Sequence, residues 1–121
     1  MTVSSLVGVY DADGGLLGEA AYLWGRLRGT RHCSLCDITH SALRRKPAWD
    51  ALVAELGLPV DLLHLNDLPP DVAEVVRASG APVVLARTDA GLEVLITGGE
   101  LEQAGGSVDV FASLLRTRLA G

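Results

Sequence analysis

Four short apolar segments alternate along the chain with longer segments in which apolar residues recur every three or four positions. The short segments are rich in β-branched and aliphatic residues and end in turn-forming residues, as expected for β-strands. They run over Val3 to Tyr10, Val60 to Leu65, Pro82 to Arg87 and Leu92 to Thr97. Thr88-Asp89-Ala90-Gly91 separates the last two, a spacing that predicts a β-hairpin.

The longer segments have the periodicity of amphipathic helices. They predict helices over about Leu16 to Leu27, from Pro47 to a stop at Gly57, after Pro69-Pro70 to a stop at Gly80, and after an N-cap at Ser107. The expected core includes Trp24, Trp49, Leu52, Val53, Leu56, Val72, Val75, Val76, Phe111, Leu114 and Leu115. Four glycines, Gly98, Gly99, Gly105 and Gly106, are expected to fill a loop.

This order of elements predicts an α/β domain with a four-stranded mixed sheet flanked by helices. A strand–helix–strand start implies parallel strands joined by a right-handed crossover, and the hairpin adds antiparallel strands. The first strand is among the most continuously apolar segments, so we expect it in the middle, in the order 2-1-3-4.

Composition is that of an ordinary globular protein: 121 residues, 49% apolar and 21% charged. No apolar run approaches the roughly 18 residues of a membrane span, and the basic start of a signal peptide is missing. We therefore expect a cytoplasmic protein without a membrane partner, whose cysteines are reduced at rest.

One basic segment stands out in a chain of net charge −5. The segment from Arg26 to Lys46 contains six basic residues and a single acid, Asp37, so its charge is +5. The basic residues are Arg26, Arg28, Arg31, Arg44, Arg45 and Lys46. Such a field favours thiolate over thiol and attracts anionic partners. The overall negative charge and the few aromatic residues argue against a nucleic-acid partner.

Both cysteines lie in this segment, within His32-Cys33-Ser34-Leu35-Cys36-Asp37-Ile38-Thr39-His40. A C-x-x-C pair brings two sulfur atoms close enough to form a disulfide or to hold one metal ion. If the stretch is helical, Cys33, Cys36, Asp37 and His40 share one face.

Thiol–disulfide exchange without a cofactor is the first functional hypothesis. Cys33, next to Arg31 and His32, would be the attacking thiolate, and Cys36, next to the opposing charge of Asp37, would resolve the mixed disulfide. The partner would be a protein or a low-molecular-weight thiol of anionic character.

Two alternatives stay open beside it. Cys33, Cys36 and His40 are ligands of the kind that suits zinc or copper, whereas His64 lies in an apolar strand and is expected to be a core or strand-end histidine. The chain would otherwise be a non-enzymatic interaction module whose basic segment docks an acidic partner.

Asp11 and Asp13 follow the carboxyl end of the first predicted strand, where α/β folds place their sites. They would bind a cation or act as a base, although aspartate and glycine are also what a tight turn requires. Neither glycine pair, Gly14-Gly15 or Gly98-Gly99, carries the fingerprint of a phosphate-binding loop.

The element order resembles that of the thioredoxin-like superfamily, and Ala81-Pro82-Val83 resembles the segment that carries the family's cis-proline. The resemblance implies a cis Ala81–Pro82 bond and a single thioredoxin-like domain over residues 1–121. In thioredoxins the C-x-x-C directly follows the first strand. Here Asp11-Ala12-Asp13-Gly14-Gly15 takes that place, so we expect a helical insertion over about 16–57 that carries the cysteines.

The first 70 residues are also similar to a small group of uncharacterised bacterial proteins. They share a Y-x-A-D-x-G turn beginning at Tyr10, a C-x-L-C pair at Cys33 to Cys36, a downstream Trp49 and the pair Leu63-His64. This resemblance implies no activity.

Overall fold

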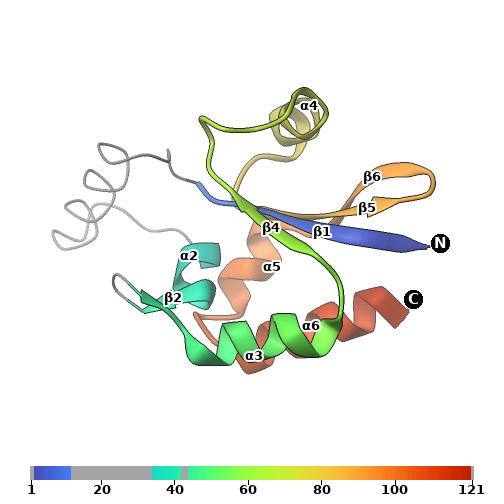
Figure 1. Ribbon diagram of the computed structural model, residues 1–121. Coiled ribbons are helices and arrows are strands. Elements are labelled where there is room, and N and C mark those ends of the chain that lie inside the picture. The colour runs from blue at the N-terminus through green and yellow to red at the C-terminus, as the bar shows by residue number, and fades with distance from the viewer. Residues whose placement is uncertain (1, 12–33, 42–43, 121) are drawn as a thin grey trace, which may run out of the picture.

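Four strands form an open mixed sheet at the centre of the molecule (Figure 1). The computed structural model describes residues 2–11, 34–41 and 44–120. The strands are β1 (Val3–Val9), β4 (Val60–Leu63), β5 (Val83–Thr88) and β6 (Gly91–Ile96), in the order β4-β1-β5-β6. The predicted order, with the first strand inside the sheet, is confirmed.

The directions of the strands also agree with the prediction. β1 runs parallel to β4, with Val9 opposite Leu63, and antiparallel to β5, with Val9 opposite Val83. β5 and β6 form the predicted hairpin, in which Thr88 Oγ1 donates to the Gly91 carbonyl. The carboxyl ends of β1 and β4 therefore lie beside the amino end of β5. Below, this end of the strands is called the carboxyl edge of the sheet.

Helices cover both faces of the sheet (Figure 1). Of the described helices, α4 (Pro70–Ser79) is the one on the first face, where Val72 packs against a cluster that includes Val7, Val9 and Leu85. The other face carries α2 (Ser34–Thr39), α3 (Pro47–Leu56), α5 (Gly98–Gln103) and α6 (Val108–Ala120). Alternate residues of β1 thus point into two separate cores.

The larger core lies between the sheet and the helices α2, α3, α5 and α6. Trp49 of α3 and Phe111 of α6 meet there with ring centroids 5.5 Å apart and planes tilted by 44°. Both residues are buried, and Leu115 beside them is 1% exposed. The predicted core positions of these two helices are confirmed, with Val53, Leu56 and Leu114 partly buried at the margin of the core.

Local signals account for several helix boundaries. Pro47 opens α3, and Gly57 ends it in the left-handed region, at a φ of 66°. Ser107 Oγ accepts from the Val110 N–H at the start of α6, so the predicted N-cap is confirmed. The predicted helix over Leu16 to Leu27 and its Trp24 lie outside the described residues.

The expectation of a loop through Gly98 and Gly99 is wrong, because these residues open helix α5. Thr97 Oγ1 accepts from the Glu100 N–H, and the Glu100 carboxylate accepts from the Thr97 N–H, which makes a complete capping box. These two bonds satisfy backbone groups at the helix start and outweigh the low helix propensity of glycine.

Candidate functional site

Polar side chains gather at the carboxyl edge of the two parallel strands. Tyr10 and Asp11 follow β1, and His64 follows β4. The Tyr10 N–H donates to the Leu63 carbonyl over 2.9 Å, which extends the pairing of the strands to this edge. Edges of this kind are where α/β folds bind their ligands, so we take it as the candidate site.

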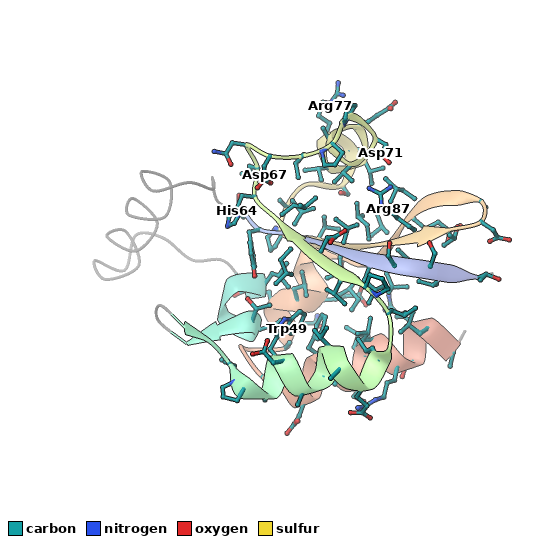
Figure 2. The ribbon with its side chains drawn as sticks, in the orientation of Figure 1. Trp49, His64, Asp67, Asp71, Arg77 and Arg87 are labelled. Carbon is teal, nitrogen blue, oxygen red and sulfur yellow. The ribbon has the colours of Figure 1, made fainter. Side chains whose placement is uncertain are left out.

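His64 is held by Asp67 in a tight turn (Figure 2). The His64 N–H donates to Asp67 Oδ1 over 2.7 Å, the Asp67 N–H donates to the His64 carbonyl, and His64 Nδ1 lies 3.5 Å from Asp67 Oδ2. The side chains are 27% and 50% exposed. The structure therefore confirms His64 as a strand-end histidine and shows that its side chain is partly exposed to solvent.

Tyr10 joins this turn to the helix that carries part of the cysteine motif. Its ring lies 5.2 Å from the His64 ring, and its hydroxyl lies 2.9 Å from the hydroxyl of Thr39 at the end of α2. Thr39 is fully buried, and its carbonyl accepts from the Lys46 N–H over 2.8 Å. Tyr10 thus contacts both His64 and α2.

The motif is described in part. Cys36 and Asp37 lie in α2, between the buried residues Leu35 and Ile38, and only their backbone is described. Cys33, His32 and Asp13 lie outside the described residues. Cys36 and Thr39 thus belong to the same short helix, three residues apart, and Thr39 is the residue that is hydrogen-bonded to Tyr10.

The condition under which His40 would share a helical face with the cysteines is not met at the end of the motif. Helix α2 ends at Thr39, and His40 begins strand β2 (His40–Ser41), which pairs antiparallel with β3 (Arg44–Arg45). The hydrogen bond from Lys46 N–H to the Thr39 carbonyl continues this small hairpin. His40 is therefore not on a helical face with Cys36 and Asp37.

Pro82 lies at the same edge of the sheet as Tyr10, since it directly precedes the Val83 that pairs with Val9. The Ala81–Pro82 bond is cis, as the resemblance implied. A Cβ atom built on Gly98 would lie 2.9 Å from the Pro82 carbonyl oxygen, so the start of α5 closely approaches this proline. Helix α2 contacts α5 and α6.

The basic segment is likewise described in part. Lys46 Nζ donates to the Gly106 carbonyl over 2.6 Å and so ties the start of α3 to the segment between α5 and α6. Arg44 and Arg45 occupy β3, while Arg26, Arg28 and Arg31 lie outside the described residues. The field proposed for the thiols remains a prediction.

No group of three or more His, Cys, Asp or Glu side chains able to hold a metal ion is found among the described residues. Cys33 is not one of these, so the zinc or copper alternative remains a prediction. Asp11 is exposed, which fits the tight turn predicted after the first strand.

The association of Tyr10, His64 and Asp67 was not predicted. The sequence H-x-x-D after a strand was a usable local signal, because aspartate three positions on can accept from the backbone of the first residue. The contact between His64 and Tyr10 has no such signal, because it depends on the pairing of β1 with β4.

Comparison of the chain with protein-family models, with curated proteins and with solved structures finds no significant match. Within the described part of the chain, no helix has the length and apolar character needed to cross a membrane.

Proposed function

We propose that this protein is a thioredoxin-like thiol–disulfide redox protein that acts through Cys33 and Cys36. The observation that carries the proposal is the buried hydrogen bond between Tyr10 and Thr39. It ties α2, the helix of Cys36, to the carboxyl edge of β1 and β4, where α/β folds place their sites. Pro82 lies at the same edge of the sheet.

The proposed reaction transfers two electrons from the two thiols to a disulfide. The Cys33 thiolate attacks one sulfur of the substrate disulfide, forms a mixed disulfide, and releases the other sulfur as a thiolate. The Cys36 thiolate then attacks the Cys33 sulfur, which closes the Cys33–Cys36 disulfide and releases the second substrate thiolate. The two protons of the cysteine thiols pass to the two released thiolates, and no cofactor is needed.

The partner is proposed to be a protein or a low-molecular-weight thiol or disulfide. The basic segment around the motif would favour an anionic one. In the thioredoxin resemblance, the strands, helices and closing hairpin form the scaffold of this chemistry. The observed element order and sheet directions support that part of the proposal.

Alkylation kinetics test the proposal. In a Cys36→Ser variant, which retains Cys33 as its one thiol, iodoacetamide should react faster at neutral pH than with a free cysteine of pKa about 8.5. The Cys33→Ser variant gives the corresponding curve for Cys36, and a variant lacking both thiols is the blank. A Cys33 that titrates at or above the free value, or that reacts only after unfolding, would overturn the redox assignment.

Metal analysis of protein purified under reducing conditions distinguishes thiol exchange from the main alternative, a zinc or copper site. Stoichiometric zinc or copper that is lost in the Cys33→Ser and His40→Ala variants would replace the redox proposal with a metal site. A metal-free protein with a reversible two-electron thiol couple would support thiol exchange.

A further inference from the structure

Strand β6 is the last strand on one side of the sheet, and no described strand lies beyond it (Figure 1). In the described part of the chain its outer side is therefore an open strand edge. A strand edge of this kind presents backbone N–H and C=O groups that can pair with a further strand. Which strand it accepts depends on the backbone groups that face outward and on the side chains that flank them.

The register of the sheet shows which backbone groups of β6 face outward. Successive residues of a strand direct their backbone groups to opposite sides. The Leu6 N–H donates over 2.9 Å to the residue that precedes β4, so Leu6 and its partner in β5, Ala86, direct their backbone groups away from each other. Ala86 therefore faces β6, where it pairs with Glu93. The neighbours of Glu93, Leu92 and Val94, thus direct their N–H and C=O groups outward.

The open part of this edge is short, because both of its ends are closed. At one end the Leu95 carbonyl accepts from Arg118 Nη1 over 3.0 Å, and Glu100 accepts from the same guanidinium. At the other end the tight hairpin turn begins at Gly91 and leads back to β5. A further strand can therefore pair with the backbone of residues 92–94 and not beyond them.

The side chains on the two faces of this edge differ in character. Leu92 is partly buried in the cluster under α4, and Val94, which lies on the same face by the alternation of the strand, is 41% exposed. Glu93 lies on the opposite face and is exposed. The outer edge of β6 therefore offers an apolar position on one face and a negative charge on the other.

A second copy of this chain fits the edge poorly. If two β6 strands paired antiparallel through Leu92 and Val94, Glu93 would lie directly opposite the same residue of the other copy. Like charges directly opposite each other destabilise a pair of strands, whereas opposite charges stabilise it. The charge of Glu93 thus favours a different strand, one with a basic residue at the facing position.

We propose that the outer edge of β6 binds an extended segment of another protein, in which a lysine or arginine stands between two β-branched residues. The segment runs antiparallel to β6 and exchanges backbone hydrogen bonds with Leu92 and Val94, as in strand addition to other sheets. Its basic side chain lies opposite Glu93, and its β-branched side chains pack beside Val94. The inference goes beyond the thiol function and uses no residue of the cysteine motif.

A peptide titration tests the proposal. The probe is the blocked peptide Ser-Thr-Val-Lys-Val-Thr-Ser, added up to millimolar concentration to the ¹⁵N-labelled full chain. We expect the largest changes in amide chemical shift, and slower amide hydrogen exchange, at Leu92 and Val94. A peptide with glutamate in place of the lysine should bind about fivefold more weakly, as expected when an attractive cross-strand pair becomes a repulsive one.

Two N-methylated peptides separate strand pairing from nonspecific contact. Methylation of both valine nitrogens removes the donors that face β6 and should abolish binding. Methylation of the lysine nitrogen, whose N–H points away from β6, should leave binding nearly unchanged.

Two charge variants of the protein test the role of Glu93. Glu93→Lys should reverse the preference, so that the glutamate peptide binds more tightly than the lysine peptide. Asp61→Lys makes the same change of charge at an exposed residue of β4, on the other side of the sheet, and should keep the wild-type preference.

Three results would overturn the proposal. They are the absence of shift changes at Leu92 and Val94, equal binding of the two N-methylated peptides, and a preference that Asp61→Lys alters as much as Glu93→Lys. Sedimentation of the wild type without peptide tests the other occupant. A monomer supports the proposal, whereas a dimer whose formation changes the amide shifts of Leu92 and Val94 would assign this edge to a second copy and refute it.

Discussion

The hydroxyls of Tyr10 and Thr39 lie 2.9 Å apart in a buried hydrogen bond that joins the end of β1 to the end of α2. The residues are 29 positions apart in the chain. This bond is a side-chain link between the central strand and the helix of Cys36, and it joins parts of the chain that meet at the candidate site.

Loss of this bond should be measurable as a coupling energy. Tyr10→Phe keeps the ring beside His64 and removes the hydroxyl, so we expect the free energy of unfolding to fall by about 1 kcal/mol. Urea unfolding of Tyr10→Phe, Thr39→Val and the double variant should give an interaction energy of roughly 1 kcal/mol. Strictly additive effects would mean that the two hydroxyls do not stabilise each other.

Gly98 and Gly99, neighbours in the first turn of α5, should respond oppositely to alanine. A Cβ atom on Gly98 would lie 2.9 Å from the Pro82 carbonyl oxygen, a backbone atom, so Gly98→Ala should destabilise by about 1–3 kcal/mol. Gly99 has open space around its Cβ position, and Gly99→Ala should stabilise by roughly 0.5 kcal/mol. Thermal unfolding of both variants checks this, and equal effects would contradict the close approach at Pro82.

Phe111 and Val110 offer a similar comparison on α6. Phe111 is 2% exposed and packs against Trp49, so Phe111→Ala should cost about 3–5 kcal/mol through the cavity that it leaves. Val110 is 52% exposed, and Val110→Ala should change the free energy of unfolding by less than about 0.5 kcal/mol. Urea unfolding monitored by tryptophan fluorescence measures both, and a large effect at Val110 would place that side chain in a packed interface.

Glu100 should make the stability of α5 depend on pH. Hydrogen bonds from Arg118 and from the Thr97 N–H hold the pKa of its carboxyl below the ordinary value of 4.5. Because the folded-state pKa is lowered, the stabilisation by the charged Glu100 is fully present above the ordinary value of 4.5. It is lost as the pH falls through the folded-state pKa. The difference in unfolding free energy between the wild type and Glu100→Gln should therefore be largest near neutral pH and shrink in acid.

The control for this measurement is Glu74→Gln, which changes an exposed acid on α4 without an ion pair among the described residues. Comparing its difference from the wild type with that of Glu100→Gln separates the effect of the Arg118 contact from the general effect of removing one exposed acid. A Glu100→Gln difference that is constant or grows in acid would contradict the role given to Arg118.

Much of the fold was predictable because its determinants are local. Short runs of β-branched and aliphatic residues marked the strands, and Pro47, Gly57 and Ser107 marked helix ends through backbone conformation and capping. The strand order followed from the apolar character of β1, which is buried by helices on both faces. The capping box at Thr97 is also local, but the low helix propensity of the two glycines after it hides the helix start in the sequence.

The candidate site was decided by the tertiary structure. The C-x-x-C motif is visible in the sequence. The contacts of Tyr10 with His64 and with Thr39 leave no local pattern, because each of them joins distant parts of the chain. The parallel register of β1 and β4 brings the first pair together, and the packing of α2 under the sheet brings the second. The sequence by itself determined which elements form and which face of each is apolar, because propensity, capping and periodicity act within a few residues. Only the register and packing of those elements decided which polar side chains meet at the edge of the sheet.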